Sequence, residues 1–450
     1  MNESDIFERL SNRYSINYPS YYSYPTIVNF KDYDDSIEKK TIRNLTDKNE
    51  LSIYIHIPFC QKLCYYCGCS KEISKDRNKG VEYTVFLIKE MELYSNKLKN
   101  TKIKKIHFGG GSPDFLRESQ YVKIFHALNN FFHLSDDIDI SIEVDPRYTE
   151  CHQILFFEKC GVSRISLGIQ DLNHEVQVAI NRVQDINKVQ LLIELARKLK
   201  FKSISIDLIY GLPLQTITSF SETIDKVIHM DITKIQLSKY AHVPNVFASQ
   251  KKLERFNFPS EIETIVMFSN AKKKLIENGY HLVGIDHFVK EEDPLLNAAK
   301  NNKIIRNYMG YEEKNTSDTL SFGVSAMSFI DGDFYINTRG RKKYYQKLRD
   351  NKSPIEKYTT CSDEDKMIRF IINEILCYKK IDFSKIDSKL SYNYILKTEL
   401  MILKKFEEDG LVTLTGSVMT ITKMGELYVK NICSIFDPRI RPLIKNKLNM

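Results

Sequence analysis

Short apolar runs of β-type residues recur six times between residues 51 and 238. Segments with a helical pattern separate them, as at 79–99, 117–132 and 186–200. Strands that alternate with helices form βαβ units, and the strands of such units lie parallel in one sheet. Six units without a clear seventh and eighth predict an α/β fold built on an incomplete (β/α)6 barrel. The expected strands are 51–57, 105–108, 139–144, 164–169, 203–209 and 234–238.

The segments on either side of these units have a different character. Residues 1–50 are polar and rich in Tyr, and they predict an extended N-terminal arm. The barrel is expected to occupy residues 51–330. A separate, mostly helical C-terminal domain is expected over 331–450. It is predicted by helical patterns at 362–378 and 395–409 and by a short hairpin pattern within 410–430.

A polar motif follows each of the six expected strands. The active site of a parallel β/α barrel is built at the carboxyl ends of its strands. We therefore expect these motifs to gather at one rim of the barrel. In chain order they are a cysteine-rich loop, "GGGSP" (109–113), "EVDP" (143–146), "GIQD" (168–171), "DLIYGLP" (207–213) and "YAHVP" (240–244).

The cysteine-rich loop is the most specific of these motifs. It holds Cys60, Cys64, Cys67 and Cys69, four of the nine cysteines in the chain. A structural zinc site would need a second Cys/His pair farther along the sequence, and none follows at a suitable spacing. The spacing also differs from the C-x2-C-x2-C-x3-C-P run of bacterial ferredoxins. Three thiolates spaced C-x3-C-x2-C can bind three irons of a 4Fe–4S cluster and leave the fourth iron open to a ligand.

Composition and charge limit the partners and the compartment. The formal net charge of +8 suits an anionic substrate, although charge alone is a weak argument. No apolar run approaches the roughly 20 residues that a membrane span requires. The polar N-terminus resembles neither a secretory signal nor a transit peptide, and no nucleic-acid-binding motif is recognisable. We therefore expect a cytoplasmic protein without a membrane span and without a nucleic-acid partner.

The motifs together resemble those of the radical S-adenosylmethionine (radical SAM) superfamily. Within it the chain is similar to the oxygen-independent coproporphyrinogen III oxidases over almost its whole length, from "SYPT" (23–26) to "NICSIFD" (431–437). Cys69 and the motifs "YAHVP" and "DHF" (286–288) are not general features of the superfamily. The related heme-chaperone branch lacks the C-x-C ending of the cysteine loop. Further shared motifs are "HFGGGSP", "SIEVDPR", "LGIQD", "NRVQ", "IDLIYGLP" and "GVSAMS".

This resemblance implies a radical SAM barrel whose cluster is bound by Cys60, Cys64 and Cys67. The open iron would bind S-adenosylmethionine (SAM) through its amino and carboxylate groups. One electron would then cleave SAM to methionine and a 5′-deoxyadenosyl radical. Cys69 is a further candidate for the catalytic centre, and the sequence leaves open whether its role is redox, proton transfer or structural.

The resemblance also implies a pocket for one or two SAM molecules. Tyr54 and Glu143 are expected both to bind SAM and to belong to the catalytic centre. Glycines in "GGGSP" are expected to let the backbone approach SAM closely, since a Cβ would collide. The expected contacts of the first SAM are Tyr54, Gly110 and Glu143, and Met327 is a further cofactor contact. The expected contacts of the second SAM are Tyr66, Gly111, Ser112, Gln170, Arg182, Asp207 and Ala241.

The implied substrate is coproporphyrinogen III, a tetrapyrrole with four propionate groups. Two of these would each lose a β hydrogen, CO2 and one electron to become vinyl groups, which gives protoporphyrinogen IX. The electron would come from a reductase or a flavodoxin-type donor, and we expect a monomer. The electron donor and the final acceptor cannot be read from the sequence.

Two departures from the family pattern bear on the substrate. Ser20 stands where the family usually has Arg, and Met309–Glu313 stands where it usually has "QGYTT". Carboxylates added near an anionic substrate repel it unless they face away or are neutralised. Two alternatives therefore stay open: a related radical SAM enzyme that performs methyl transfer or heme breakdown on another substrate, and a heme-binding or trafficking protein.

Overall fold

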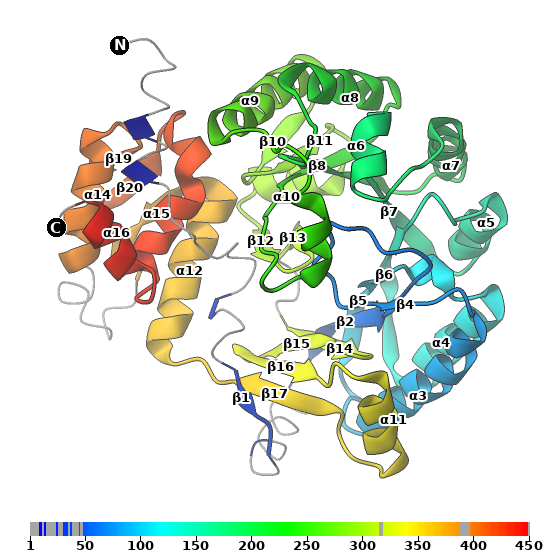
Figure 1. The fold of residues 1–450 in the computed structure, drawn as a ribbon. Coiled ribbons are helices and arrows are strands. Elements are labelled where there is room, and N and C mark those ends of the chain that lie inside the picture. Colours follow the sequence, from blue (N-terminus) through cyan, green and yellow to red (C-terminus); the bar gives the residue numbers. More distant parts are fainter. Residues whose placement is uncertain are drawn as a thin grey trace.

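The computed structural model describes residues 48–314, 318–386 and 397–448. Of the N-terminal arm it describes residues 9–10, 13–14, 24–25, 30–34, 37 and 45, so Ser20 lies outside the described residues. A large curved sheet with helices along its outer face forms the main body, and a smaller helical part lies beside it (Figure 1).

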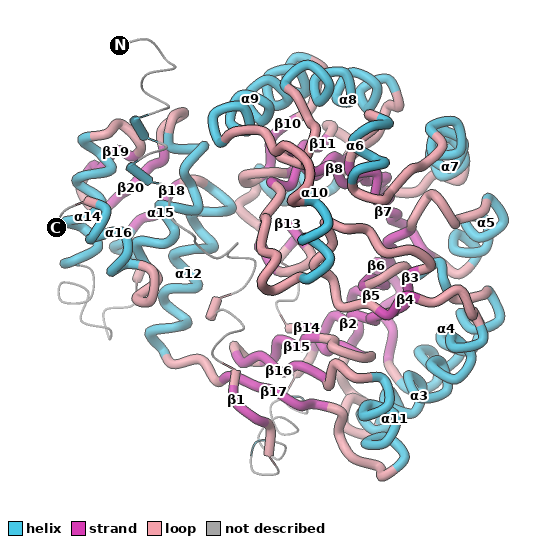
Figure 2. Tube along the Cα trace, viewed as in Figure 1, coloured by secondary structure: helices cyan, strands magenta, loops and turns pink. Residues whose placement is uncertain are grey.

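Six parallel strands form the centre of the sheet and confirm the six expected units. They pair in chain order, and a further parallel strand, β14 (Thr319–Phe322), pairs with the free side of the first. Helices that connect the strands cover the outer face (Figure 2). The six strands are β2 (Glu50–Ile57), β5 (Lys102–Gly110), β6 (His133–Val144), β7 (Val162–Gln170), β8 (Ser203–Tyr210) and β9 (Lys234–Lys239). The helices are α3 (Asn78–Ser95), α4 (Glu118–Phe131), α5 (Cys151–Lys159), α7 (Ile186–Lys198), α8 (Ile217–His229) and α9 (Glu261–Glu277).

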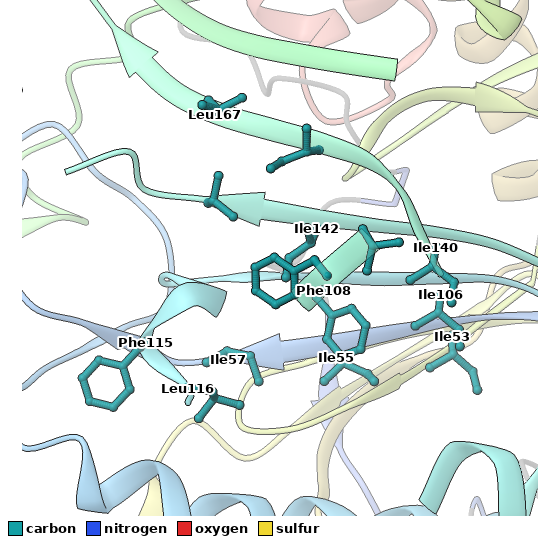
Figure 3. Packing of buried hydrophobic residues seen from close by; sticks show 14 of the residues in the cluster. Ile53, Ile55, Ile57, Ile106, Phe108, Phe115, Leu116, Ile140, Ile142 and Leu167 are labelled. Carbon is teal, nitrogen blue, oxygen red and sulfur yellow. The ribbon is translucent and has the colours of Figure 1, made fainter. Parts of the chain in front are cut away.

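Side chains along these strands alternate between the two faces of the sheet. In β2, Ile53, Ile55 and Ile57 are buried in the main hydrophobic core, together with residues such as Phe108 of β5 (Figure 3). Successive residues of a strand point to opposite faces, so the residues between these isoleucines point to the inner face. A parallel sheet covered by helices on both faces would read as an unbroken apolar run. The alternation therefore marks an inner face that carries polar groups.

The sheet continues beyond residue 330, where we expected the barrel domain to end. Beyond β14 the sheet adds four strands, each antiparallel to its neighbour, in the order β15 (Met327–Ile330), β16 (Asp333–Asn337), β17 (Ile355–Thr359) and β1 (Lys31–Asp32). At the other edge β11 (His287–Val289) pairs antiparallel with β9, and β10 (His281–Val283) pairs antiparallel with β11. The strand β1 also ties part of the N-terminal arm to the sheet.

The C-terminal part has a hydrophobic core of its own, to which Leu10 and Tyr14 of the arm contribute. It contains the expected helices and hairpin, and the hairpin belongs to a sheet of three strands. We propose that the domain boundary lies between β17 and the first of these helices. The elements are α12 (Asp363–Tyr378), α14 (Lys397–Glu408), α15 (Val429–Phe436), α16 (Arg441–Lys447), β18 (Lys380–Asp382), β19 (Val412–Thr415) and β20 (Val418–Ile421).

Shorter elements complete the described part of the chain. None of the helices in the described ranges is long and apolar enough to cross a membrane. The shorter elements are β3 (Phe59–Cys60), β4 (Glu72–Ile73), α6 (His174–Ala179), α10 (Pro294–Lys300), β12 (Ile304–Asn307), β13 (Gly310–Glu313) and α11 (Arg341–Arg349).

Candidate functional site

The register of the parallel strands brings polar side chains together on the inner face. Tyr54 of β2 lies opposite His107 of β5, and Gly168 of β7 lies opposite Asp207 of β8. Glu143 of β6 lies one strand away from each of these pairs. Because the strands are parallel, residues near their carboxyl ends meet at one edge. The expected gathering of motifs at one rim follows from this register.

A hydrogen-bonded chain connects strand β2 to the end of the cysteine loop. The hydroxyl of Tyr54 lies 3.0 Å from Nδ1 of His56, and Nε2 of His56 lies 3.0 Å from the carbonyl oxygen of Ser70. A carbonyl only accepts, so Nε2 carries the proton and donates, while Nδ1 accepts from Tyr54. Burial lowers the pKa of His56, which keeps the ring neutral. Burial likewise raises the pKa of Tyr54 well above its usual value.

The cysteine loop presents thiols that fit an iron–sulfur cluster. Cys64 is buried, Cys60 and Cys67 are half-buried, and all nine cysteines are free. In the described ranges no three His, Cys, Asp or Glu side chains converge as a site for one metal ion would require. A cluster has no such requirement, because each thiolate binds a different iron. Burial raises the pKa of Cys60 to about 12, with the neighbouring Cys67 and Cys64 adding to the effect.

Hydrogen-bond donors surround these sulfurs. The backbone N–H of Cys69 donates to Sγ of Cys67 at 3.4 Å. The hydrogen bond from the Cys69 side chain lowers the pKa of Cys67 to about 6. Nη2 of Arg147 and Nη1 of Arg182 lie 3.3 Å and 3.5 Å from Sγ of Cys64. Thiolates that accept N–H bonds are the donor set typical of iron–sulfur sites, so the residues present fit a 4Fe–4S cluster.

The glycines of "GGGSP" lie so close to other parts of the protein that a side chain would not fit. Gly110 has a φ of +116°, and a Cβ there would lie 2.6 Å from Cε1 of His56. A Cβ on Gly111 would lie 2.7 Å from the carbonyl oxygen of Phe59. We expected these glycines to make room for SAM. The structure adds a requirement within the protein itself, since both pack the end of β5 against β2 and the start of the cysteine loop.

Glu143 lies beside two aromatic side chains on the inner face. Its Oε1 is 3.2 Å from Nε2 of His107, whose ring stacks on Tyr54 with centroids 5.7 Å apart. The side chain of Glu143 is 45% exposed, which leaves carboxylate surface free for a ligand. His107 stands in the motif "HFGGGSP" but was not among the expected site residues. The alternation of β5 was the signal that could have placed it on the inner face.

The expected contacts of a second SAM include a half-buried carboxyl group, Asp207, and a buried cation, Arg182. Burial raises the pKa of Asp207 to about 6, with Glu143 adding to the effect, and Ser166 donates a 3.3 Å hydrogen bond to its carboxylate. Arg182 donates to the carbonyl oxygen of Gly168 at 2.5 Å. Gln170 is buried and has a φ of +70°, in the left-handed region that non-glycine residues rarely adopt.

The remaining expected contacts are held by hydrogen bonds to neighbouring loops. Ser112 donates to Asp114 at 2.5 Å. Tyr66 and Ala241 are tied together, because the amide of Gln250 donates to both of their carbonyl oxygens, at 2.9 Å and 3.2 Å. Ala241 itself is exposed.

Met327 is connected to the centre of the site through a residue that the sequence did not single out. The hydroxyl of Tyr308 donates to the carbonyl oxygen of Met327 at 3.0 Å. The ring of Tyr308 meets Tyr54 edge-on, with centroids 5.6 Å apart. Tyr308 thus links strand β15 to the inner face at β2.

The departure at Met309–Glu313 falls on strand β13 and its approach. Glu312 accepts a 3.1 Å hydrogen bond from the amide of Asn307. Burial raises the pKa of Tyr308, and Glu312 adds to that effect. Burial lowers the pKa of Lys234, and Glu312 is among the carboxylates that oppose it. Glu312 therefore lies near the inner face, where it accepts from Asn307 and is close enough to the half-buried Lys234 to affect it electrostatically.

Comparisons with known proteins agree with this geometry. Residues 54–227 match the family model of the Radical SAM superfamily. The fold and the cysteine loop thus define a radical SAM enzyme, whose cofactors are a 4Fe–4S cluster and SAM.

Relatives identify the family within this class. Proteins named oxygen-independent coproporphyrinogen III oxidase are 33% identical in Salmonella typhimurium, over 96% of this chain and 95% of theirs, and 35% identical in Helicobacter pylori, over 97% of both chains. The solved structure titled coproporphyrinogen III oxidase (HemN) from Escherichia coli, a radical SAM enzyme, matches with a TM-score of 0.88 at 32% identity, over 93% of this chain and 97% of that one. The chain belongs to the oxygen-independent coproporphyrinogen III oxidase family. The family and the fold inferred from the sequence are confirmed.

Proposed function

We propose that this enzyme converts coproporphyrinogen III to protoporphyrinogen IX without oxygen, as the name of its relatives implies. Each of two propionate side chains loses a hydrogen atom from its β carbon, CO2 and one electron, and becomes a vinyl group. The observation that carries the proposal is the placement of Tyr54, Glu143 and Asp207 on one inner face beside a C-x3-C-x2-C loop whose sulfurs accept N–H bonds.

The chain's own residues divide the work of binding and positioning. We propose that Cys60, Cys64 and Cys67 hold the cluster. Tyr54 and Glu143 border the SAM bound there, with Gly110 and Met327 as further contacts. When bound, the cluster and SAM supply the 5′-deoxyadenosyl radical that takes the hydrogen atom. The contacts proposed for a second SAM are Arg182 and six others: Tyr66, Gly111, Ser112, Gln170, Asp207 and Ala241.

Arg182 and Cys69 have more specific proposed roles. Arg182 is buried, and its Nε–H has no partner within the described part of the protein, which leaves a charge-assisted donor for the carboxylate of the second SAM. The backbone N–H of Cys69 donates to Cys67, which supports a role for Cys69 in holding the cluster loop. Free cysteines throughout the chain fit a reducing compartment, and we propose a cytoplasmic monomer that receives electrons from a reductase or a flavodoxin-type donor.

Product analysis tests the substrate. Reduced, anaerobic enzyme with its cluster reconstituted is mixed with SAM and coproporphyrinogen III, and products are followed by chromatography and mass. We expect a tricarboxylate intermediate, then protoporphyrinogen IX, with two CO2 released per product. SAM cleavage without any decarboxylated tetrapyrrole would contradict the proposal. In that case, replacement of Met309–Glu313 by Gln-Gly-Tyr-Thr-Thr separates the two explanations, because only an obstructing Glu312 or Glu313 predicts that activity returns.

A second prediction concerns the orientation of SAM. We expect Glu143→Ala to lower the rate of 5′-deoxyadenosine formation by about 100-fold, the order of loss that a misplaced reactant causes. The iron content should stay unchanged, because the carboxylate is proposed to orient SAM and not to bind iron. Glu158→Ala, at an exposed position on the outer helix α5, serves as the control. Normal turnover together with normal SAM affinity in Glu143→Ala would refute this role.

A further inference from the structure

Two guanidinium groups converge on the sulfur of Cys64. Nη2 of Arg147 lies 3.3 Å from Sγ, and Nη1 of Arg182 lies 3.5 Å from it. Both arginine side chains are only 7% exposed. Charged side chains that are this deeply buried are rare unless they are paired. The two arginines therefore belong to the interior of the site and do not form a chance surface contact.

Asp145 orients both arginines towards the sulfur. Its carboxylate accepts from Nε of Arg147 at 2.9 Å and from Nη2 at 2.6 Å. It also accepts from Nη1 of Arg182 at 3.1 Å. Burial opposes the ionised form of Asp145, but the two guanidinium groups outweigh it and hold the pKa of the carboxyl below its usual range. An ionised Asp145 thus fixes the two cations at Cys64.

The two arginines differ in what else they touch. Arg182 is proposed to bind a SAM carboxylate, so it has a ligand role already. The polar side-chain contacts of Arg147 lie within the protein: Asp145, the carbonyl oxygen of Asn181 at 3.4 Å, and Cys64. Its backbone is also held, because Lys188 donates to its carbonyl oxygen at 3.4 Å. Because the polar contacts of this buried guanidinium are to the protein, and one of them is to a cluster cysteine, we look for a role of Arg147 other than ligand binding.

We propose that Arg147 is a tuning residue, whose N–H···S hydrogen bond to Cys64 raises the reduction potential of the 4Fe–4S cluster. Hydrogen bonds to the cysteine sulfurs and nearby charge are among the factors that set the potential of such clusters. Reduction adds negative charge to the cluster, and a fixed cation with an N–H aimed at the sulfur stabilises that charge. Arg147 therefore makes the cluster easier to reduce and favours the electron transfer on which SAM cleavage depends. The inference rests on Cys64 as a cluster ligand and is independent of the tetrapyrrole.

The test is the midpoint potential of the reconstituted cluster, measured by a redox titration followed by electron paramagnetic resonance, without SAM or tetrapyrrole. We expect Arg147→Gln to shift the midpoint to a more negative value and to alter the signal of the reduced cluster. With a fixed reductant, SAM cleavage should fall about 10-fold or more, as losses in the surroundings of metal ligands commonly do. A stronger reductant should restore much of that loss, which a damaged fold would not allow.

Lys188→Gln is the matched control, because it removes one positive charge next to Arg147 and leaves the bond to Cys64 in place. Its midpoint should equal that of the native enzyme. Equal midpoints in the native, Arg147→Gln and Lys188→Gln proteins would overturn the proposal, and so would equal shifts in both variants. Should Arg147→Gln fail to assemble a cluster, Arg147→Lys takes its place. Lys keeps the positive charge but cannot donate to Asp145 and Cys64 at the same time, as the guanidinium does. A midpoint potential more negative than that of the native enzyme is therefore expected for Arg147→Lys as well. An unchanged midpoint would refute the role of the hydrogen bond.

Discussion

Cys64→Ala is expected to lose the cluster and, with it, all SAM cleavage. Of the four cysteines on the loop, the three spaced C-x3-C-x2-C are the proposed ligands, and a cluster with one open iron needs all three. Cys64 is buried and its sulfur faces two guanidinium groups. Without the thiolate the two guanidinium groups keep Asp145 but lose the sulfur, and only two of the three proposed ligands remain. Anaerobic reconstitution followed by iron and sulfide analysis, visible absorption and 5′-deoxyadenosine measurement checks the result.

A cysteine outside the loop provides the control for this experiment. Cys151 begins the outer helix α5 and is half-buried. Ala is the best helix former, so Cys151→Ala should keep the full cluster and near-native activity. Four irons and normal SAM cleavage in Cys64→Ala would show that the ligand assignment is wrong.

Gly110→Ala is expected to have the second largest effect, on both stability and SAM binding. The left-handed backbone at Gly110 costs an alanine about 1–2 kcal/mol. The new Cβ would also lie 2.6 Å from the ring of His56, which cannot turn away because Tyr54 and Ser70 hold both of its nitrogens. Overpacking of this kind costs about 1–3 kcal/mol more. Thermal unfolding and the dissociation constant of SAM should both show the damage.

Gly279 offers a matched control for the backbone effect alone. Its φ is +82°, and a Cβ there would meet no atom within 4 Å. Gly279→Ala should therefore be destabilised only by the strain of the left-handed backbone, and it should bind SAM normally. If the two variants were equally stable and equally active, the packing of Gly110 against His56 would not contribute to stability or to SAM binding.

Much of the barrel could be predicted because apolar β-type runs alternate with helical patterns along the sequence. Ile53, Ile55 and Ile57 belong to the core while Tyr54 and His56 face inward, and this period of two is visible in the sequence. The extension of the sheet past residue 330 was not visible. Strands β15, β16 and β17 extend the sheet beyond β14, each antiparallel to the strand before it. The pairing of β14 with β2 and the strands that follow depends on tertiary contacts that no local pattern encodes.

The site divides in the same way. The cysteine loop could be predicted because all of its ligands lie within eight residues, and spacing alone carries the chemistry. Arg147 and Tyr308 were missed as contributors. Arg147 donates to Cys64, which lies 83 positions earlier in the sequence, and Tyr308 donates to Met327 of strand β15. Such contacts arise only when separate strand ends meet at one rim.

The most direct test of the proposed reaction follows the hydrogen atom itself. Coproporphyrinogen III deuterated at the β carbons of its propionates is incubated anaerobically with reduced enzyme and SAM. The account predicts one deuterium in each 5′-deoxyadenosine formed, together with two CO2 per protoporphyrinogen IX. Unlabelled 5′-deoxyadenosine, or labelled 5′-deoxyadenosine without a vinyl product, would contradict it.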